Sequence, residues 1–194
     1  MDERYPIYWT FDFNIGVGKP FSVCFFQCIK GIFHFFDEII IEGQQTEEIC
    51  HEALNRGLLD YRTQYVITGD QTGKRRDTRS KRDDFRIIED FLKQNKNKYN
   101  QHVSHKVKLP TKNPPIRKRH NLVNGKFYNM KKEVNLFVYK NCATLDKGFR
   151  LTHLVKGGQY LEDDSDFFQH VTTAAGYGIN ICEATNKPNK SGMM

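Results

Sequence analysis

Three β-type segments follow one another at the start of the chain and restrict its fold more than any other feature. Residues 7–13, 21–29 and 32–41 are rich in aromatic and β-branched side chains and show no helical period. The turn-forming stretch NIGVGKP separates the first two segments, and Lys30-Gly31 separates the last two. Short connections of this kind pair consecutive strands antiparallel. We therefore expect the fold to open with a three-stranded antiparallel meander.

Helical and strand patterns alternate after this meander. Thr46 is the expected N-cap of a helix with acidic residues in its first turn, and Asp83 or Asp84 is the expected cap of the next helix. Strands are predicted at 65–70, 101–109 and 134–139, and further helices at 115–123, 143–155 and 166–179. This order predicts one α/β domain over residues 1–194, with a mixed central sheet and helices on its faces.

The first turn contains a sequence that imitates a phosphate-binding loop. Such a loop requires the pattern G-x-x-x-x-G-K-[ST] followed by a helix. Counting back from Gly18 and Lys19 puts Phe13 where the first glycine belongs, and Pro20 occupies the Ser/Thr position. The next segment is a strand, so no helix N-terminus would face the anion. We therefore predict a hairpin turn here and no ATPase site.

Carboxylates at the ends of predicted elements form a second candidate site. The set is Asp12 in the first strand, Glu38 late in the third, Asp70 at the end of the fourth, and Asp163, Asp164 and Asp166 before or at the last helix. Each has a simpler interpretation alone: Asp70 in a turn, Asp164 or Asp166 as a helix cap, Asp12 facing solvent at an edge. Converging on one sheet edge, such oxygen ligands suit Mg²⁺ or Mn²⁺.

Basic residues cluster in two stretches of a chain whose net charge is +7. The clusters comprise Lys74, Arg75, Arg76, Arg79, Lys81 and Arg82, and then Arg117, Lys118 and Arg119. Solvated loops are the simpler interpretation of each cluster alone. Two clusters in one small domain favour a polyanionic partner, most simply nucleic acid.

Three motifs together resemble a known family. FDFNIGVGKP opens the meander, VITGDQTGKRRDTRSKRDDF follows one helix, and HVTTAAGYGI lies in the last helix. In this combination the chain resembles the nuclease domain of tailed-bacteriophage terminase large subunits. The resemblance implies an RNase H-like fold with helices on both faces of the sheet. It also implies an endonuclease that uses one or two Mg²⁺ or Mn²⁺ ions to cut concatemeric viral DNA during genome packaging, with little sequence specificity.

The resemblance assigns the metal ligands only in part. Asp12 and Asp70 match the family pattern directly. The family often has an aspartate three residues after the histidine of the last helix, but here His170 is followed at that spacing by Thr173. We expect Asp166 to replace it, with Asp163 or Asp164 as alternatives from the preceding loop and Glu38 as a weaker candidate. His170 is expected to orient a water molecule or a phosphate.

The partners implied by the resemblance are a packaging ATPase domain, a small terminase subunit and the portal, in the host cytoplasm. No ATPase motif occurs in this chain, so we expect it to be the nuclease domain alone. No apolar run approaches the roughly 20 residues of a membrane span, and the five cysteines form no CxxC pair. Two alternatives stay open: another RNase H-like enzyme, such as a junction resolvase or an RNA–DNA hybrid nuclease, and a non-catalytic basic DNA-binding module.

Overall fold

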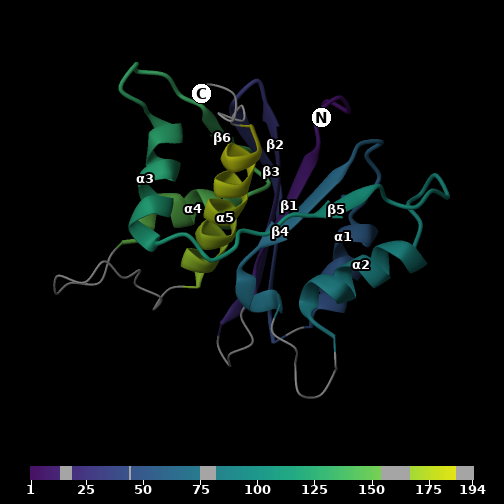
Figure 1. The fold of residues 1–194 in the computed structure, drawn as a ribbon. Helices are drawn as coiled ribbons and strands as arrows, with labels where there is room; N and C mark the ends of the chain where they lie inside the picture. The colour runs from purple at the N-terminus through teal and green to yellow at the C-terminus, as the bar shows by residue number, and fades with distance from the viewer. Residues whose placement is uncertain (14–18, 44, 75–81, 154–166, 187–194) are drawn as a thin grey trace, which may run out of the picture.

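A computed structural model of the chain describes residues 1–13, 19–43, 45–74, 82–153 and 167–186. A central sheet separates two layers of helices, with α1 and α2 on one face and α3, α4 and α5 on the other (Figure 1). The fold is therefore α/β with both faces of the sheet covered, as the sequence predicted. The expected hairpin turn after the first strand falls on residues 14–18, outside the described residues.

The sheet has six strands in the order β5-β4-β1-β2-β3-β6. They are β1 (Ile7–Asp12), β2 (Pro20–Ile29), β3 (Ile32–Glu42), β4 (Tyr65–Gly69), β5 (His105–Val107) and β6 (Leu136–Val138). The pairs β1–β2 and β2–β3 are antiparallel, which confirms the predicted meander. The other three strands pair parallel with their neighbours, so the sheet is mixed. The outermost strands are shorter than predicted because only part of each segment finds a pairing partner.

The helices are α1 (Thr46–Asn55), α2 (Asp84–Gln94), α3 (Ile116–Phe127), α4 (Ala143–Leu151) and α5 (Phe168–Asn186), and a 3-10 helix, η1 (Gln71–Lys74), follows β4. Two cap predictions meet different outcomes. Asp83 caps α2 by accepting a hydrogen bond from the Arg86 backbone N–H at 2.9 Å. Gln45, not Thr46, is the N-cap of α1, because Gln45 is extended and pairs reciprocally with Glu48.

Aromatic packing fills the core beneath α1 and α2. Trp9 and Phe25, neighbours on β1 and β2, are fully buried, and their rings stack with centroids 5.3 Å apart. Ile49 of α1 and Ile88 of α2 are also fully buried in this cluster. Burial of a side chain of this size contributes about 1.5–3 kcal/mol, so this layer holds β1 firmly at the centre of the sheet.

Small residues let α5 approach the opposite face of β1. Ala174 lies fully buried on α5, and its carbonyl oxygen accepts a 2.7 Å hydrogen bond from the Thr10 hydroxyl. A Cβ atom at Gly178 would lie 2.6 Å from the Phe26 ring, a distance too short for any larger residue there. This contact places the N-terminal turns of α5 over the end of β1.

Candidate active site at the ends of β1 and β4

Asp12 and Asp70 are brought together by the parallel pairing of β1 and β4. Phe11 is the register partner of Gly69, and the Asp70 N–H donates a 3.1 Å hydrogen bond to the Phe11 carbonyl. A Cβ atom at Gly69 would lie only 2.4 Å from that carbonyl oxygen, so glycine is needed for this close approach. Two carboxylate residues that are distant in sequence therefore lie at the C-terminal ends of adjacent strands, at the same end of the sheet, as the sequence predicted.

Asp12 is buried in the centre of the sheet rather than exposed at its edge. β1 lies between β4 and β2, and Asp12 is only 5% exposed. His170 of α5 places its Nδ1 3.1 Å from Oδ2 of Asp12, within hydrogen-bond distance. Since a buried carboxylate is costly without partners, the contact with His170 accounts for part of its stabilisation. The solvent-facing alternative for Asp12 is excluded.

Asp70 uses one carboxylate oxygen in local structure. Its Oδ1 accepts a 2.9 Å hydrogen bond from the Thr72 N–H at the start of η1 and a second, close one from Nδ2 of Asn113. The turn role that the sequence left open is therefore present. Among the described residues, however, Oδ2 of Asp70 has no hydrogen-bond partner. The second oxygen is thus left for a ligand such as a cation.

Buried hydroxyl oxygens around the two aspartates fit a hydrated cation. Ser22 is the register partner of Asp12, Thr68 precedes Asp70 by two residues, and Thr72 follows it by two. Within the described part of the chain, the buried hydroxyl oxygens of these three residues have no hydrogen-bond partner. A bound water or ion is one of the explanations for an unsatisfied buried oxygen. Mg²⁺ usually keeps several of its own waters, and these could satisfy such hydroxyls.

The predicted third ligand lies outside the structure's described range. Asp163, Asp164 and Asp166 all fall within residues 154–166, which are not described. In the parts of the chain that are described, no three His, Cys, Asp or Glu side chains form a cluster able to hold a metal ion. A third carboxylate from the segment before α5 therefore stays a prediction.

Thr173, at the position where a metal ligand was expected, forms hydrogen bonds with other side chains. Its hydroxyl accepts hydrogen bonds from Nε2 of Gln169 at 2.9 Å and from Nη2 of Arg119 at 3.3 Å. The Arg119 guanidinium also lies 4.9 Å over the ring of Tyr177. A buried arginine thus lies against the position where an aspartate, often present in the family pattern, was expected from the resemblance.

This placement corrects the expectation for Arg119 as a surface DNA contact. Arg119 is only 3% exposed, whereas its neighbours Arg117 and Lys118 are both exposed on α3. Successive helical residues point about 100° apart, so one member of a contiguous basic run turns inward. From the sequence it was grouped with its neighbours, because a run of basic residues does not show which of them points into the core.

Glu38 is likewise committed elsewhere. Its two carboxylate oxygens accept hydrogen bonds from the backbone N–H groups of Thr144 at 2.7 Å and Leu145 at 2.8 Å. It therefore caps the N-terminus of α4, and we leave it out of the proposed metal site. Burial is the main cause that raises the pKa of this carboxyl above its usual value.

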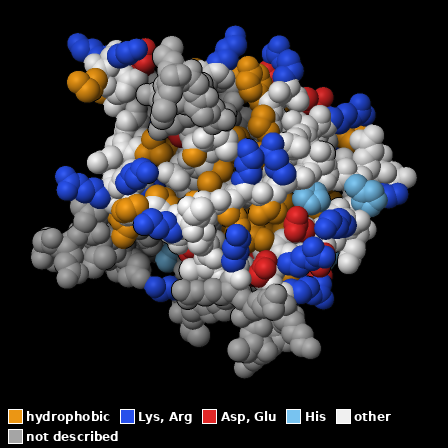
Figure 2. Space-filling view, viewed as in Figure 1, with side chains coloured by type: hydrophobic (Ala, Val, Ile, Leu, Met, Phe, Trp, Pro, Cys, Tyr) orange, Lys and Arg blue, Asp and Glu red, His pale blue; other side chains and the backbone are white. Residues whose placement is uncertain are grey.

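The remaining basic candidates divide between described and undescribed segments. Lys74 and Arg82, the first and last residues of the first cluster, are described, while Arg75, Arg76, Arg79 and Lys81 lie outside the described residues. The second cluster borders a groove of about 630 Å³ between loop 108–115 and the C-terminal half of α5. Lys108, Lys112 and Lys118 line this groove. Figure 2 shows Lys and Arg side chains spread over this side of the molecule.

Asn113 is a site residue that was not predicted from the sequence. It lies in a proline-rich loop, 43 residues from Asp70 along the chain, yet its side chain contacts the Asp70 carboxylate. A single asparagine between prolines is typical of a turn, so no sequence signal separated it from an ordinary loop residue.

Comparison with known proteins identifies the fold. No protein-family model matches the chain, and no curated protein matches its sequence. The nuclease domain of the bacteriophage SPP1 large terminase g2p, solved with bound Mn, matches with a TM-score of 0.55, 14% identity and coverage of 90% of this chain and 85% of that one. The P22 large terminase nuclease domain matches with a TM-score of 0.66, 11% identity and coverage of 95% and 84%.

A longer protein also shares this fold. The large terminase of a thermophilic bacteriophage, in complex with ATP-γ-S, matches with a TM-score of 0.61 and 15% identity over 93% of this chain but only 41% of its own length. The chain thus spans about two fifths of that protein. The TM-scores show that these proteins and this chain share a fold, and at identities this low the likeness extends to the fold alone. The predicted RNase H-like fold class is confirmed.

Proposed function

We propose that this chain is a metal-dependent endonuclease domain that cuts concatemeric double-stranded viral DNA during genome packaging. The observation that carries the proposal is the meeting of Asp12 and Asp70 at the ends of β1 and β4, with His170 of α5 against Asp12. The shared fold with the Mn-bound SPP1 nuclease domain supports it.

The surroundings of each residue suggest its role in the proposed reaction. Asp12, the second oxygen of Asp70 and a carboxylate from the 163–166 cluster, which we expect to be Asp166, would hold one or two Mg²⁺ or Mn²⁺ ions. When bound, such an ion activates a water molecule and offsets negative charge on the phosphate. His170 holds the orientation of the Asp12 carboxylate through its 3.1 Å contact.

DNA would bind through its backbone along the basic surface. Lys118 lines the groove beside α5, and Arg117 precedes Lys118 on α3. Lys74 and Arg82 are the first and last residues of the first basic cluster. Phosphate contacts of this kind position a duplex without reading its sequence, so cleavage would depend little on sequence. Arg75, Arg76, Arg79 and Lys81 are proposed to extend this surface.

We further propose that the domain works with a packaging ATPase domain, a small terminase subunit and the portal in the host cytoplasm. The match to two fifths of the longer large terminase supports an additional domain in the working protein. No helix in the described part of the chain has the length and apolar character of a membrane span.

The test is cleavage of supercoiled plasmid in Mn²⁺ by the wild type and by Asp12→Asn. We expect the variant to lose on the order of 100-fold or more of the rate, because losing a metal ligand costs at least as much as losing a group behind one. Asp146→Asn is the matched control, since Asp146 is exposed in a surface pair with Arg150 on α4. EDTA should abolish wild-type cleavage.

Undiminished cutting by Asp12→Asn would contradict the assignment of the site. Four-way junctions and RNA–DNA hybrids are offered in parallel with the plasmid. Preference for either substrate would replace packaging by one of the other RNase H-like activities, and DNA binding without cleavage in any divalent ion would favour a binding module.

A further inference from the structure

The loop between β5 and α3 reaches the candidate metal site through one side chain. Asn113 donates a hydrogen bond from Nδ2 to Oδ1 of Asp70 and accepts one at its own Oδ1 from the Gln71 N–H at 3.0 Å. The side-chain amide of Gln71 binds back to the Pro110 carbonyl. The loop and the segment after Asp70 are therefore joined by three hydrogen bonds.

These bonds determine the orientation of the Asn113 amide. Its oxygen faces a backbone N–H and its nitrogen faces a carboxylate, so a flipped amide would set donor against donor and acceptor against acceptor. The amide therefore holds a single orientation between Gln71 and Asp70. A side chain fixed at both ends is suited to fixing a third group.

The group it fixes is the Asp70 carboxylate. Oδ1 of Asp70 receives two donors, the Thr72 N–H and the Asn113 amide. Among the described residues Oδ2 receives none. The two donors on Oδ1 restrict rotation of the carboxylate and so determine where Oδ2 points.

We propose that Asn113 is a positioning residue that orients Asp70 for the divalent cation. The proposal rests on the proposed function, because it concerns the same metal site. In this proposal Asn113 acts on the metal through its hydrogen bond to Asp70 and is not itself a metal ligand. Residues behind metal ligands typically change metal affinity by about 10–100-fold when they are removed.

The same loop also lines the groove beside α5, so DNA binding supplies a second readout. Lys108 and Lys112 line the groove beside α5 together with Asn113 itself. If removal of the Asn113 amide only collapsed the loop, DNA binding in EDTA would fall along with metal binding. If Asn113 positions Asp70, metal affinity falls by much more than metal-free DNA binding, to which Asn113 contributes only as one of several residues that line the groove.

The experiment compares the wild type with Asn113→Ala and with Asn121→Ala, a matched control on the exposed side of α3. Mn²⁺ binding to the DNA-free protein is measured by calorimetry or electron paramagnetic resonance. We expect the dissociation constant for Mn²⁺ to rise about 10–100-fold in Asn113→Ala and to change less than about twofold in the control. Plasmid cleavage by Asn113→Ala should recover as Mn²⁺ is raised.

Two outcomes would overturn the proposal: unchanged Mn²⁺ affinity in Asn113→Ala, or equal losses of Mn²⁺ affinity and metal-free DNA binding. If Asn113→Ala does not fold, Asn113→Ser is compared instead, since its shorter hydroxyl cannot serve both partners of the amide. Failure of the proposed function is distinct, because then the wild type itself neither binds Mn²⁺ nor cuts DNA.

Discussion

Two buried carboxylates of the sheet, Asp12 and Glu38, show how surroundings decide the role of a residue. Both lie inside aromatic, β-prone segments, so the sequence made both candidates for metal binding. Glu38 has its two oxygens satisfied by the first turn of α4, more than a hundred residues away. Asp12 faces a histidine and neighbours an unsatisfied serine hydroxyl. The chain pattern predicted Asp12 and Asp70, but only the three-dimensional packing could separate Glu38 from them.

The free energy of unfolding should depend on pH because the Glu38 carboxyl is buried. Because burial raises its pKa, the folded protein binds the proton more tightly than the unfolded chain does. The contribution of this group to the free energy of unfolding therefore falls as pH rises from its usual value of 4.5 towards neutrality. Glu38→Gln lacks this dependence, so its stability relative to the wild type should improve over that range.

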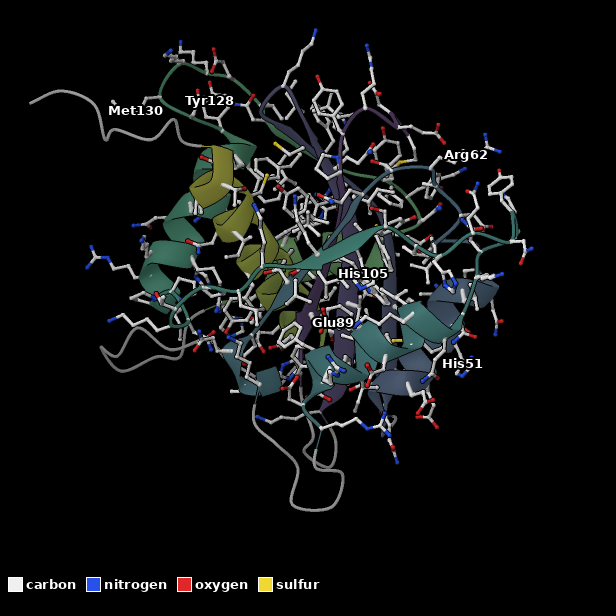
Figure 3. The ribbon with its side chains drawn as sticks, turned by 45° about the vertical axis from the view of Figure 1, so that its right-hand side comes forward. His51, Arg62, Glu89, His105, Tyr128 and Met130 are labelled. Atoms are coloured by element: carbon white, nitrogen blue, oxygen red, sulfur yellow. The ribbon has the colours of Figure 1, made fainter. Side chains whose placement is uncertain are left out.

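Urea unfolding of both proteins at pH 4.5 and at neutral pH, in EDTA, checks this expectation. Glu89→Gln, on α2 (Figure 3), controls for the loss of one negative charge. If the stability of Glu38→Gln relative to the wild type stays constant or falls as the pH rises, the raised pKa of Glu38 is contradicted.

At the level of elements, α5 serves two neighbours at once. One side of it meets β1 through Ala174 and Gly178, and another receives Arg119 of α3. The position and type of α5, the meander and most other elements followed from sequence periodicity. The limits of β5, β6 and α4 did not, because pairing and packing with distant segments decide where they end.

Gly176 makes room for the buried arginine. A Cβ atom there would lie 2.6 Å from Cγ and Cδ of Arg119. Gly176→Ala should therefore lower the free energy of unfolding by about 1–3 kcal/mol, the usual cost of overpacking. Gly125→Ala is the control, since a Cβ atom there meets nothing within 4 Å and alanine favours the helix by up to about 1 kcal/mol.

A double-mutant cycle attributes the cost to this contact. Adding Arg119→Ala to Gly176→Ala should destabilise less than the sum of the two single changes, because the clashing side chain is then absent. Chemical denaturation of the four proteins measures the coupling. Additive effects would show that Gly176 is needed for some other reason.

At the scale of the whole molecule, positive charge is the property that bears most on DNA. The chain carries a net charge of +7, and three lysines line the groove next to α5. Other basic residues, such as Lys131 and Lys140, follow α3 and β6. In Figure 3 Tyr128 and Met130, which precede Lys131 in the chain, lie at the upper left of the view. The sequence predicted a basic surface but could not show which lysines line the groove.

DNA affinity should therefore depend on salt and on the location of the charge removed. Each phosphate contact contributes about −0.9 to the slope of log K against log salt for duplex DNA. Lys108→Ala combined with Lys118→Ala should reduce the magnitude of that slope by about 2. Lys131→Ala with Lys140→Ala removes the same charge outside the groove and should leave the slope nearly unchanged. Fluorescence anisotropy in EDTA at several salt concentrations measures it, and equal effects of the two pairs would refute a localised binding groove.

The contact between Asp12 and His170 has a consequence for the order in which the protein is made. The two residues are 158 positions apart, so a ribosome must synthesise nearly the whole domain before they can meet. A nascent or truncated chain that stops before α5 has the aspartates but not the helix that holds Asp12. The nuclease activity proposed for this chain would thereby be withheld until synthesis and folding of the domain are almost complete.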